Sequence, residues 1–558
     1  MSRSLTQNAP LGSRKLLSRI LDQPNLVAAV QALPAQALGK LIEYVGLEDS
    51  GEIVTLATTE QIKGLFDDDL WRSERPGKDE TFDADRFALW LEVMLEAGEE
   101  FAAQRLAELP EDLVTLAMQK HVLVINIDQL AVVMSNRQSG PKADDDALME
   151  KALESCLCEE IGEFRIISLK HDGWDAILSV LLALDRDHHD LLQRVLERCC
   201  YAASEYIEDN GGLYEVLTSE KMLEADVAGE REDRRAEEGF VAPSTAASFL
   251  SLARTMKLGD IIQATDRDPV TRAYFRTLRS GATATATGTR SRGNDTTPVA
   301  DSSDAAKLVQ VLRDAEVLPS ASPLRRLEAK TDAPSDETCD SFSQAVRELH
   351  LQAAEIHAQR MAELAYLANV LVAGCSIEGR SFRSVEAARA VVAACSLGLE
   401  YLHETKAGSG APIDIVQSQG ADKLFMIGWW FLHQGVVTPA ARCLERLLAH
   451  EAGRVSDRRL GNELGQATAA LRSALAVKKP WTARSKLVVL CDFIEPADWS
   501  ALLSLIDECP HLSGKLRSID EAQTVGEIRF VATQAQLAHV KSFLDELEAD
   551  FSANSGPR

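Results

Sequence analysis

The residues best suited to metal binding lie in the run Asp-Arg-Asp-His-His-Asp at positions 185–190. Acids at its first and third positions match the opening of a calcium-binding loop. Such a loop needs glycine at its sixth position and glutamate at its last, where this chain has Asp190 and Leu196. We interpret the run as a solvated turn that caps the following helix, and keep four residues as metal-ligand candidates: Asp185, Asp187, His189 and Asp190.

Other groups with metal-binding chemistry are acids or thiols. The acidic run 144–146 is a second candidate for sensing a divalent ion. Cys156, Cys158, Cys199 and Cys200 could meet as a zinc site, but paired cysteines of structural zinc sites usually have two to four residues between them. We therefore expect these cysteines to pack in helices as small apolar side chains.

Motifs of nucleophilic catalysis and of phosphate binding are absent from the sequence. It contains no G-x-S-x-G, H-E-x-x-H or C-x-x-C motif and neither glycine-rich phosphate loop. Cys375 stands where a helix end is expected, and a catalytic thiol there would need a base such as His403. His350 and His357 are seven residues apart, about 10.5 Å along one helix, too far to share an ion directly. The sequence leaves enzyme activity open, favours its absence and predicts no cofactor.

The densest aromatic cluster is Trp429-Trp430-Phe431. Its apolar surroundings predict core packing of a bundle helix. The alternative is an anchor for a protein partner, because tryptophan often dominates the energetics of interfaces. Trp429 and Trp430 are therefore the partner-binding candidates.

Composition favours a mainly α fold. Aromatic residues make up only 5% of the chain, while alanine and leucine are plentiful. Short helices are expected in the first 120 residues, with a capping box at Thr58 and Gln61 and with helix starts at Leu33-Pro34 and Leu109-Pro110. The two similar starts indicate a repeat-like helical array. The β-branched segments 121–127 and 163–168 predict a small antiparallel insert, after which helices are expected at 174–184 and 191–207.

The second half reads as a helical bundle. Long helices are predicted at 342–373 and 385–402. A further helix is predicted that Thr438 caps and Pro439 begins. Short strands at 487–491 and 528–531 suggest a small α/β cap. Residues 281–303 are rich in Ala, Thr, Gly and Ser, as linkers are. The predicted regions are a helical array (1–120), a helical region with the β insert (121–280), a flexible linker region (281–338), a C-terminal helical domain (339–480) and the possible cap (481–558).

Charge and hydropathy narrow the classes of partner. The net charge of −27 disfavours nucleic acid and anionic lipid. No run of 18 apolar residues is present, so we expect no membrane insertion, and no apolar leader opens the chain. Cysteines within apolar helical patterns fit a reducing compartment, so we expect a cytoplasmic protein.

Two resemblances add to this reading. The segments 239–243, 247–250, 362–371 and 382–388 resemble a large bacterial family that has only a domain-of-unknown-function label, which implies no established activity or catalytic residue. The first 120 residues, with short Leu-rich helices, Leu-Pro starts and acidic turns, are similar to the N-terminal superhelical domain of MgtE-type magnesium transporters. The chain lacks that family's membrane part.

These observations lead to two hypotheses of function. The first is a helical scaffold or regulator that acts through contacts with a protein partner, because helical arrays build extended binding surfaces. The alternative is an enzyme with a dispersed site or a protein that senses a divalent metal.

Overall fold

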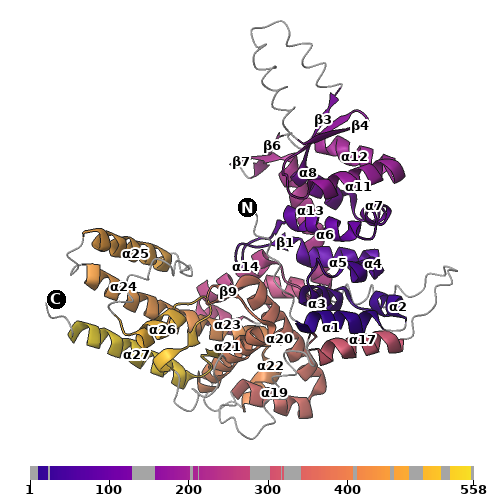
Figure 1. Ribbon diagram of the computed structural model, residues 1–558. Coiled ribbons are helices and arrows are strands. Elements are labelled where there is room, and N and C mark those ends of the chain that lie inside the picture. The colour runs from indigo at the N-terminus through magenta and orange to yellow at the C-terminus, as the bar shows by residue number, and fades with distance from the viewer. Residues whose placement is uncertain are drawn as a thin grey trace. The chain divides into compact units, whose positions relative to one another are not determined.

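The computed structural model describes residues 11–22, 25–127, 157–200, 205–210, 213–264, 266–276, 302–315, 317–318, 341–405, 411–452, 458–476, 494–516 and 528–553 (Figure 1). These residues form two compact units. Unit 1 takes its residues from 1–72, 80–234 and 291–320, and unit 2 from 73–79, 235–290 and 321–558. Helices dominate both units, so the predicted mainly α fold is confirmed.

Unit 1 is built from short helices. They are α1 (Leu11–Leu21), α2 (Leu26–Gln31), α3 (Ala35–Val45), α4 (Gly51–Leu56), α5 (Thr59–Asp69), α6 (Ala84–Leu95), α7 (Glu99–Ala107), α8 (Glu111–His121), α11 (Trp174–Asp187), α12 (His189–Cys200), α17 (Ser302–Asp314) and α13 (Ser219–Glu237), whose last residues belong to unit 2.

Local sequence signals set several of these helix starts. The capping box before α5 is confirmed: the Thr58 backbone N–H donates to Gln61 Oε1 (2.9 Å), and the Gln61 N–H donates to Thr58 Oγ1 (3.2 Å). Pro34 and Pro110 immediately precede α3 and α8, as the two Leu-Pro starts predict.

The predicted β insert of unit 1 is also confirmed. Strands β3 (Val122–Asn126), β4 (Cys158–Ile161) and β5 (Phe164–Ser168) form an antiparallel sheet in the order β3-β5-β4. Two further hairpins are β1 (Trp71–Arg72) with β2 (Thr81–Phe82), and β6 (Glu205–Asn210) with β7 (Leu213–Thr218). The helix expected at 191–207 ends earlier, at Cys200, and β6 follows. The Gly211-Gly212 dipeptide, which connects β6 and β7 in the sequence, is a hairpin signal that the prediction of a helix overlooked.

The region 281–338, predicted as a flexible linker, needs a correction. Its described part contains α17, and Leu308 and Leu312 of that helix are fully buried in the core of unit 1. Two leucines four residues apart lie on the same side of a helix, and here that side packs into the core.

Unit 2 contains longer helices. They are α14 (Pro243–Thr255), α15 (Leu258–Gln263), α19 (Ser341–Gln352), α20 (Ala354–Gly374), α21 (Ser384–Thr405), α22 (Pro412–Ser418), α23 (Ala421–Phe431), the π-helix η1 (Leu432–Val437), α24 (Thr438–Ala452), α25 (Arg458–Ala476), α26 (Pro496–Leu505) and α27 (Gln534–Ala553). Its hairpin pairs β8 (Ser376–Ile377) with β9 (Arg380–Ser381). Strand β10 (His511–Leu512) pairs with β11 (Arg529–Phe530), inside the predicted strand 528–531, whereas 487–491 lies outside the described residues.

Two predicted helix boundaries in unit 2 are wrong. The helix expected at 342–373 breaks at Ala353, whose φ of −149° is incompatible with a helix. Thr438 does not cap a new helix, because its backbone is helical (φ −65°, ψ −46°) and α23, η1 and α24 follow one another without a gap. We call this continuous segment, 421–452, the central rod. Pro439 cannot donate a helical hydrogen bond, and the π-turn lies immediately before it.

The central rod crosses α21 at very short range. A Cβ atom at Gly428 would lie 1.8 Å from the Ala394 carbonyl oxygen, and one at Gly398 would lie 2.1 Å from the Leu424 carbonyl oxygen. Only glycine fits at these two positions. The absence of a side chain there lets the backbones of the rod and α21 approach closely.

Within the described part of the chain, no helix is both long and apolar enough to cross a membrane.

Candidate functional sites

The predicted metal-ligand candidates lie where α11 ends and α12 begins. His189 Nδ1 is 2.9 Å from Asp185 Oδ1, and both side chains are exposed. Asp187 pairs with Arg186 at 2.7 Å, and this hydrogen bond lowers the pKa of Asp187. The described residues contain no group of three or more metal-ligating side chains, and the run 144–146 lies outside them. Metal binding by Asp185, Asp187, His189 and Asp190 stays a prediction.

The predicted thiol groups are mostly buried. Burial raises the pKa of Cys199 to about 12 and raises that of Cys375 well above its usual value. Cys375 has Cys509 and acidic residues as electrostatic neighbours, whereas His403, its proposed base, is exposed on α21. A thiol held protonated by burial is a poor nucleophile. Cys158 is exposed, on β4, and Cys156 lies outside the described residues.

The two candidate tryptophans differ in exposure. Trp429 is only 2% exposed and stacks on Phe425, with ring centroids 5.4 Å apart. The core reading therefore replaces the partner-contact hypothesis for Trp429. Trp430 is half-buried beside Phe431 and stays a partner-binding candidate.

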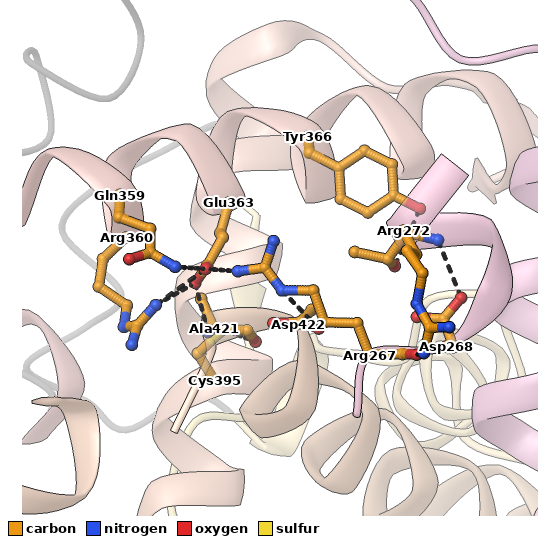
Figure 2. Close-up of polar contacts among 11 residues, drawn as sticks. Arg267, Asp268, Arg272, Gln359, Arg360, Glu363, Tyr366, Cys395, Ala421 and Asp422 are labelled. Atoms are coloured by element: carbon orange, nitrogen blue, oxygen red, sulfur yellow. Dashed lines mark hydrogen bonds and ion pairs between the residues drawn. The ribbon is translucent and has the colours of Figure 1, made fainter. Parts of the chain in front are cut away.

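A buried charge network at the start of the central rod was not predicted (Figure 2). Glu363 on α20 is fully buried and accepts hydrogen bonds from four groups. Arg360 Nη1 donates to both of its oxygens (2.8 and 2.7 Å), Gln359 donates at 3.1 Å, and Arg267 donates from a different segment. The Ala421 N–H, at the N-terminus of α23, donates to Glu363 Oε2 at 2.8 Å. Glu363 thereby pairs with two arginines and caps the N-terminus of the rod.

Arg360 ties a second helix to this network. Its Nε donates to the Val416 carbonyl at 2.8 Å and its Nη2 to the Gln417 carbonyl at 3.3 Å, both in α22. These carbonyl groups belong to the last turn of α22. Carbonyl groups in a last turn have no N–H partner within their own helix. A single Arg–Glu pair therefore holds the end of one helix and the start of the next.

Asp422 differs from Glu363 because its partners are weaker. Its Oδ2 is 3.8 Å from Arg267 Nε, and no described residue bonds Oδ1. Burial, followed by the negative charge of Glu363, raises the pKa of Asp422 to about 6. Gly420 makes room for this carboxylate, since a Cβ there would lie 2.1 Å from Oδ1.

A second polar group is buried in the π-turn of the rod. His433 is 3% exposed, and burial, with the positive charge of Arg254, lowers its pKa to about 3. The ring bonds to the backbone of Glu508, but its Nε2 has no partner among the described residues. His433 is therefore neutral in the fold at any pH near 7.

Two exposed leucines, Leu123 and Leu169, lie on the same face of the β3-β5-β4 sheet. Val122, Val124 and Ile166 are buried on one face of this sheet. Leu123, Ile167 and Leu169 lie on the opposite face, which we call the outer face. Leu123 is 46% exposed and Leu169 is 55% exposed, whereas Ile167, which pairs with Leu123, is buried at 5%. The Leu169 N–H donates to the His121 carbonyl, so the two leucines are diagonal neighbours on adjacent strands.

Fold and sites together define a mainly helical protein of two units with a small exposed sheet. Residues 1–210, which lie in unit 1 apart from 73–79, match the model of a family of unknown function (DUF6178). This match covers less than half of the chain. The resemblance to a family with an unknown-function label is thus confirmed for 1–210, although the segments that suggested it lie further along. Nothing shows the MgtE-type resemblance, and no curated protein or solved structure compared with the chain matches it.

Proposed function

We propose that this protein binds another protein in the cytoplasm, as a scaffold or regulator, and that the outer face of the β3-β5-β4 sheet is its contact surface. The observation that supports this is the exposure of Leu123 on β3 and of its diagonal neighbour Leu169, which directly follows β5. Complete burial of an exposed leucine side chain contributes about 1.5–3 kcal/mol, so covering these two half-exposed side chains contributes roughly half of that each. The net charge of −27 favours a protein over a nucleic acid as the partner.

The test is quantitative affinity purification from native cells with three forms of the full chain. In the double variant Leu123→Lys/Leu169→Lys, charges replace the apolar pair. Leu182→Lys on α11 is the matched control, because Leu182 is also 46% exposed but lies on a helix. We expect one protein to be retained by the wild type and the control and reduced about tenfold by the double variant. Retention that does not depend on these two leucines would refute the surface.

A second candidate function, an enzyme with a dispersed site, is favoured by one observation. Asp422 has a carboxyl pKa of about 6 beside Arg267, and such shifts are enriched at functional sites. We expect that a small molecule bound there would raise the melting temperature of the wild type but not of Asp422→Asn. A metabolite screen by thermal shift that finds no such compound would remove this alternative.

A further inference from the structure

Strand β4 has an open edge. In the order β3-β5-β4 it pairs only with β5 among the described strands. The Ser168 N–H donates to the Leu157 carbonyl at 2.8 Å, and hydrogen-bonded positions alternate along an antiparallel strand. Glu159 and Ile161 therefore direct their backbone groups toward β5, whereas Cys158 and Glu160 direct theirs toward the open edge. An unpaired edge of this kind is a template for a further strand.

The charges on β4 restrict what can pair with it. Glu159, Glu160 and the turn residue Glu163 are exposed, and Arg165 pairs with Glu160 at 2.5 Å. A second copy of this chain that paired through its own β4 would bring glutamates opposite glutamates, which is destabilising. A strand with lysine or arginine at these positions would instead gain cross-strand attraction.

We propose that the open edge of β4 accepts an extended segment with alternating basic and apolar residues, which adds to the sheet as an antiparallel strand. This inference rests on the proposed function, because it specifies the partner of the same sheet. Backbone hydrogen bonds to Cys158 and Glu160 supply affinity, and the glutamates supply the preference for a basic strand. Side chains on one face of the added strand lie beside Cys158 and Glu160, which share the outer face with Ile167, and those on its other face lie beside Glu159.

Proline at position 160 tests the backbone contact. Glu160→Pro removes the outward N–H and leaves the β4–β5 hydrogen bonds intact, whereas Glu160→Ala removes the same carboxylate but keeps the N–H. The probe is a fluorescein-labelled heptapeptide of alternating lysine and valine, with a glutamate–valine heptapeptide as its counterpart. Binding to the full chain is followed by fluorescence anisotropy, and melting temperatures check folding. Cys158→Pro with Cys158→Ala repeats the comparison if Glu160→Pro does not fold.

We expect the lysine peptide to bind Glu160→Ala at least about tenfold more tightly than Glu160→Pro, and the glutamate peptide to bind neither. Equal binding to both variants would overturn strand addition, because only general attraction to an acidic chain would remain. Light scattering that shows a dimer of the wild type, absent in Glu160→Pro, would overturn the partner class. A cellular partner lost from Leu123→Lys/Leu169→Lys but kept by Glu160→Pro would leave the proposed function standing and refute this inference alone.

Discussion

Buried polar groups are stabilised differently at two regions of the central rod, its start and its π-turn. At its start, Glu363 is paired with two arginines and also accepts hydrogen bonds from an amide side chain and a backbone N–H. In its π-turn, His433 has one backbone bond and loses its charge instead, with a pKa of about 3. Asp422, next to the first region, is intermediate because its pKa of about 6 lies close to neutrality. Burial can therefore be met by pairing a charge or by removing it, and the two solutions respond differently to mutation and to pH.

The largest expected loss of stability comes from removing the carboxylate of Glu363, which pairs with the two arginines. Glu363→Gln leaves Arg360 buried without a compensating charge and leaves Arg267 with only the more distant Asp422, and should destabilise unit 2 by about 3–5 kcal/mol. Urea unfolding, with hydrogen exchange of the α20 and α23 amides, measures this loss. Glu355→Gln, an exposed position on the same helix, is the control and should change stability by less than about 0.5 kcal/mol. Similar stability of both variants would mean that the network contributes little.

A slightly smaller effect is expected where the rod crosses α21, between its two polar regions. Gly428→Ala would place Cβ 1.8 Å from the Ala394 carbonyl oxygen, so the helices must separate. We expect a loss of about 3 kcal/mol, at the upper end for overpacking. Gly465→Ala in α25, which packs on α24 and has open space at this position, should instead stabilise by about 0.5–1 kcal/mol. Thermal unfolding of both variants tests this contrast, and a Gly428→Ala protein as stable as wild type would contradict the close crossing.

The amount that sequence reveals follows from how local each signal is. The capping box at Thr58 and the paired segments 121–127 and 163–168 were predictable, because each depends on neighbouring residues or on β-branched composition. The rings of His350 and His357 were expected to be far apart, yet their centroids are 4.7 Å apart. The break at Ala353 divides the expected single helix into two, α19 and α20, and no helix-breaking residue type at this position predicts it.

The charge network could not be predicted for a related reason. Arg267, Glu363 and Asp422 come from three segments of the chain, and only the tertiary fold brings them together. One signal was available: Asp422 stands at the head of a strongly apolar run, where an acid needs a partner or a raised pKa. Likewise Pro439 inside an apolar run was read as a helix start, although a π-turn before it can keep a helix continuous.

Acidification should strengthen the region around Asp422. Its folded pKa of about 6 exceeds the unfolded value of 3.8, so the folded state binds more protons between these values. Stability from this group is therefore gained as pH falls from about 6 to about 4, by roughly 2–3 kcal/mol at most. Asp422→Asn should lack this gain, while the exposed control Asp550→Asn should keep it. Melting temperatures at pH 7.5 and 4.5 decide, and parallel profiles for wild type and Asp422→Asn would exclude a titrating Asp422.

Acidification should have the opposite effect at the neutral, buried His433, where it lowers stability. Its folded pKa of about 3 lies below the unfolded 6.5, so the unfolded state takes up the proton first. The stability that depends on a neutral His433 is complete above pH 6.5 and falls by about 1.4 kcal/mol per pH unit below it, or roughly 2 kcal/mol by pH 5. His433→Gln should lose none of this between pH 7.5 and pH 5, whereas the exposed control His403→Gln should follow the wild type. Unfolding free energies at the two pH values measure the difference. If His433→Gln keeps the full acid sensitivity of the wild type, the π-turn does not hold a neutral imidazole, and the contrast between the two regions of the rod disappears.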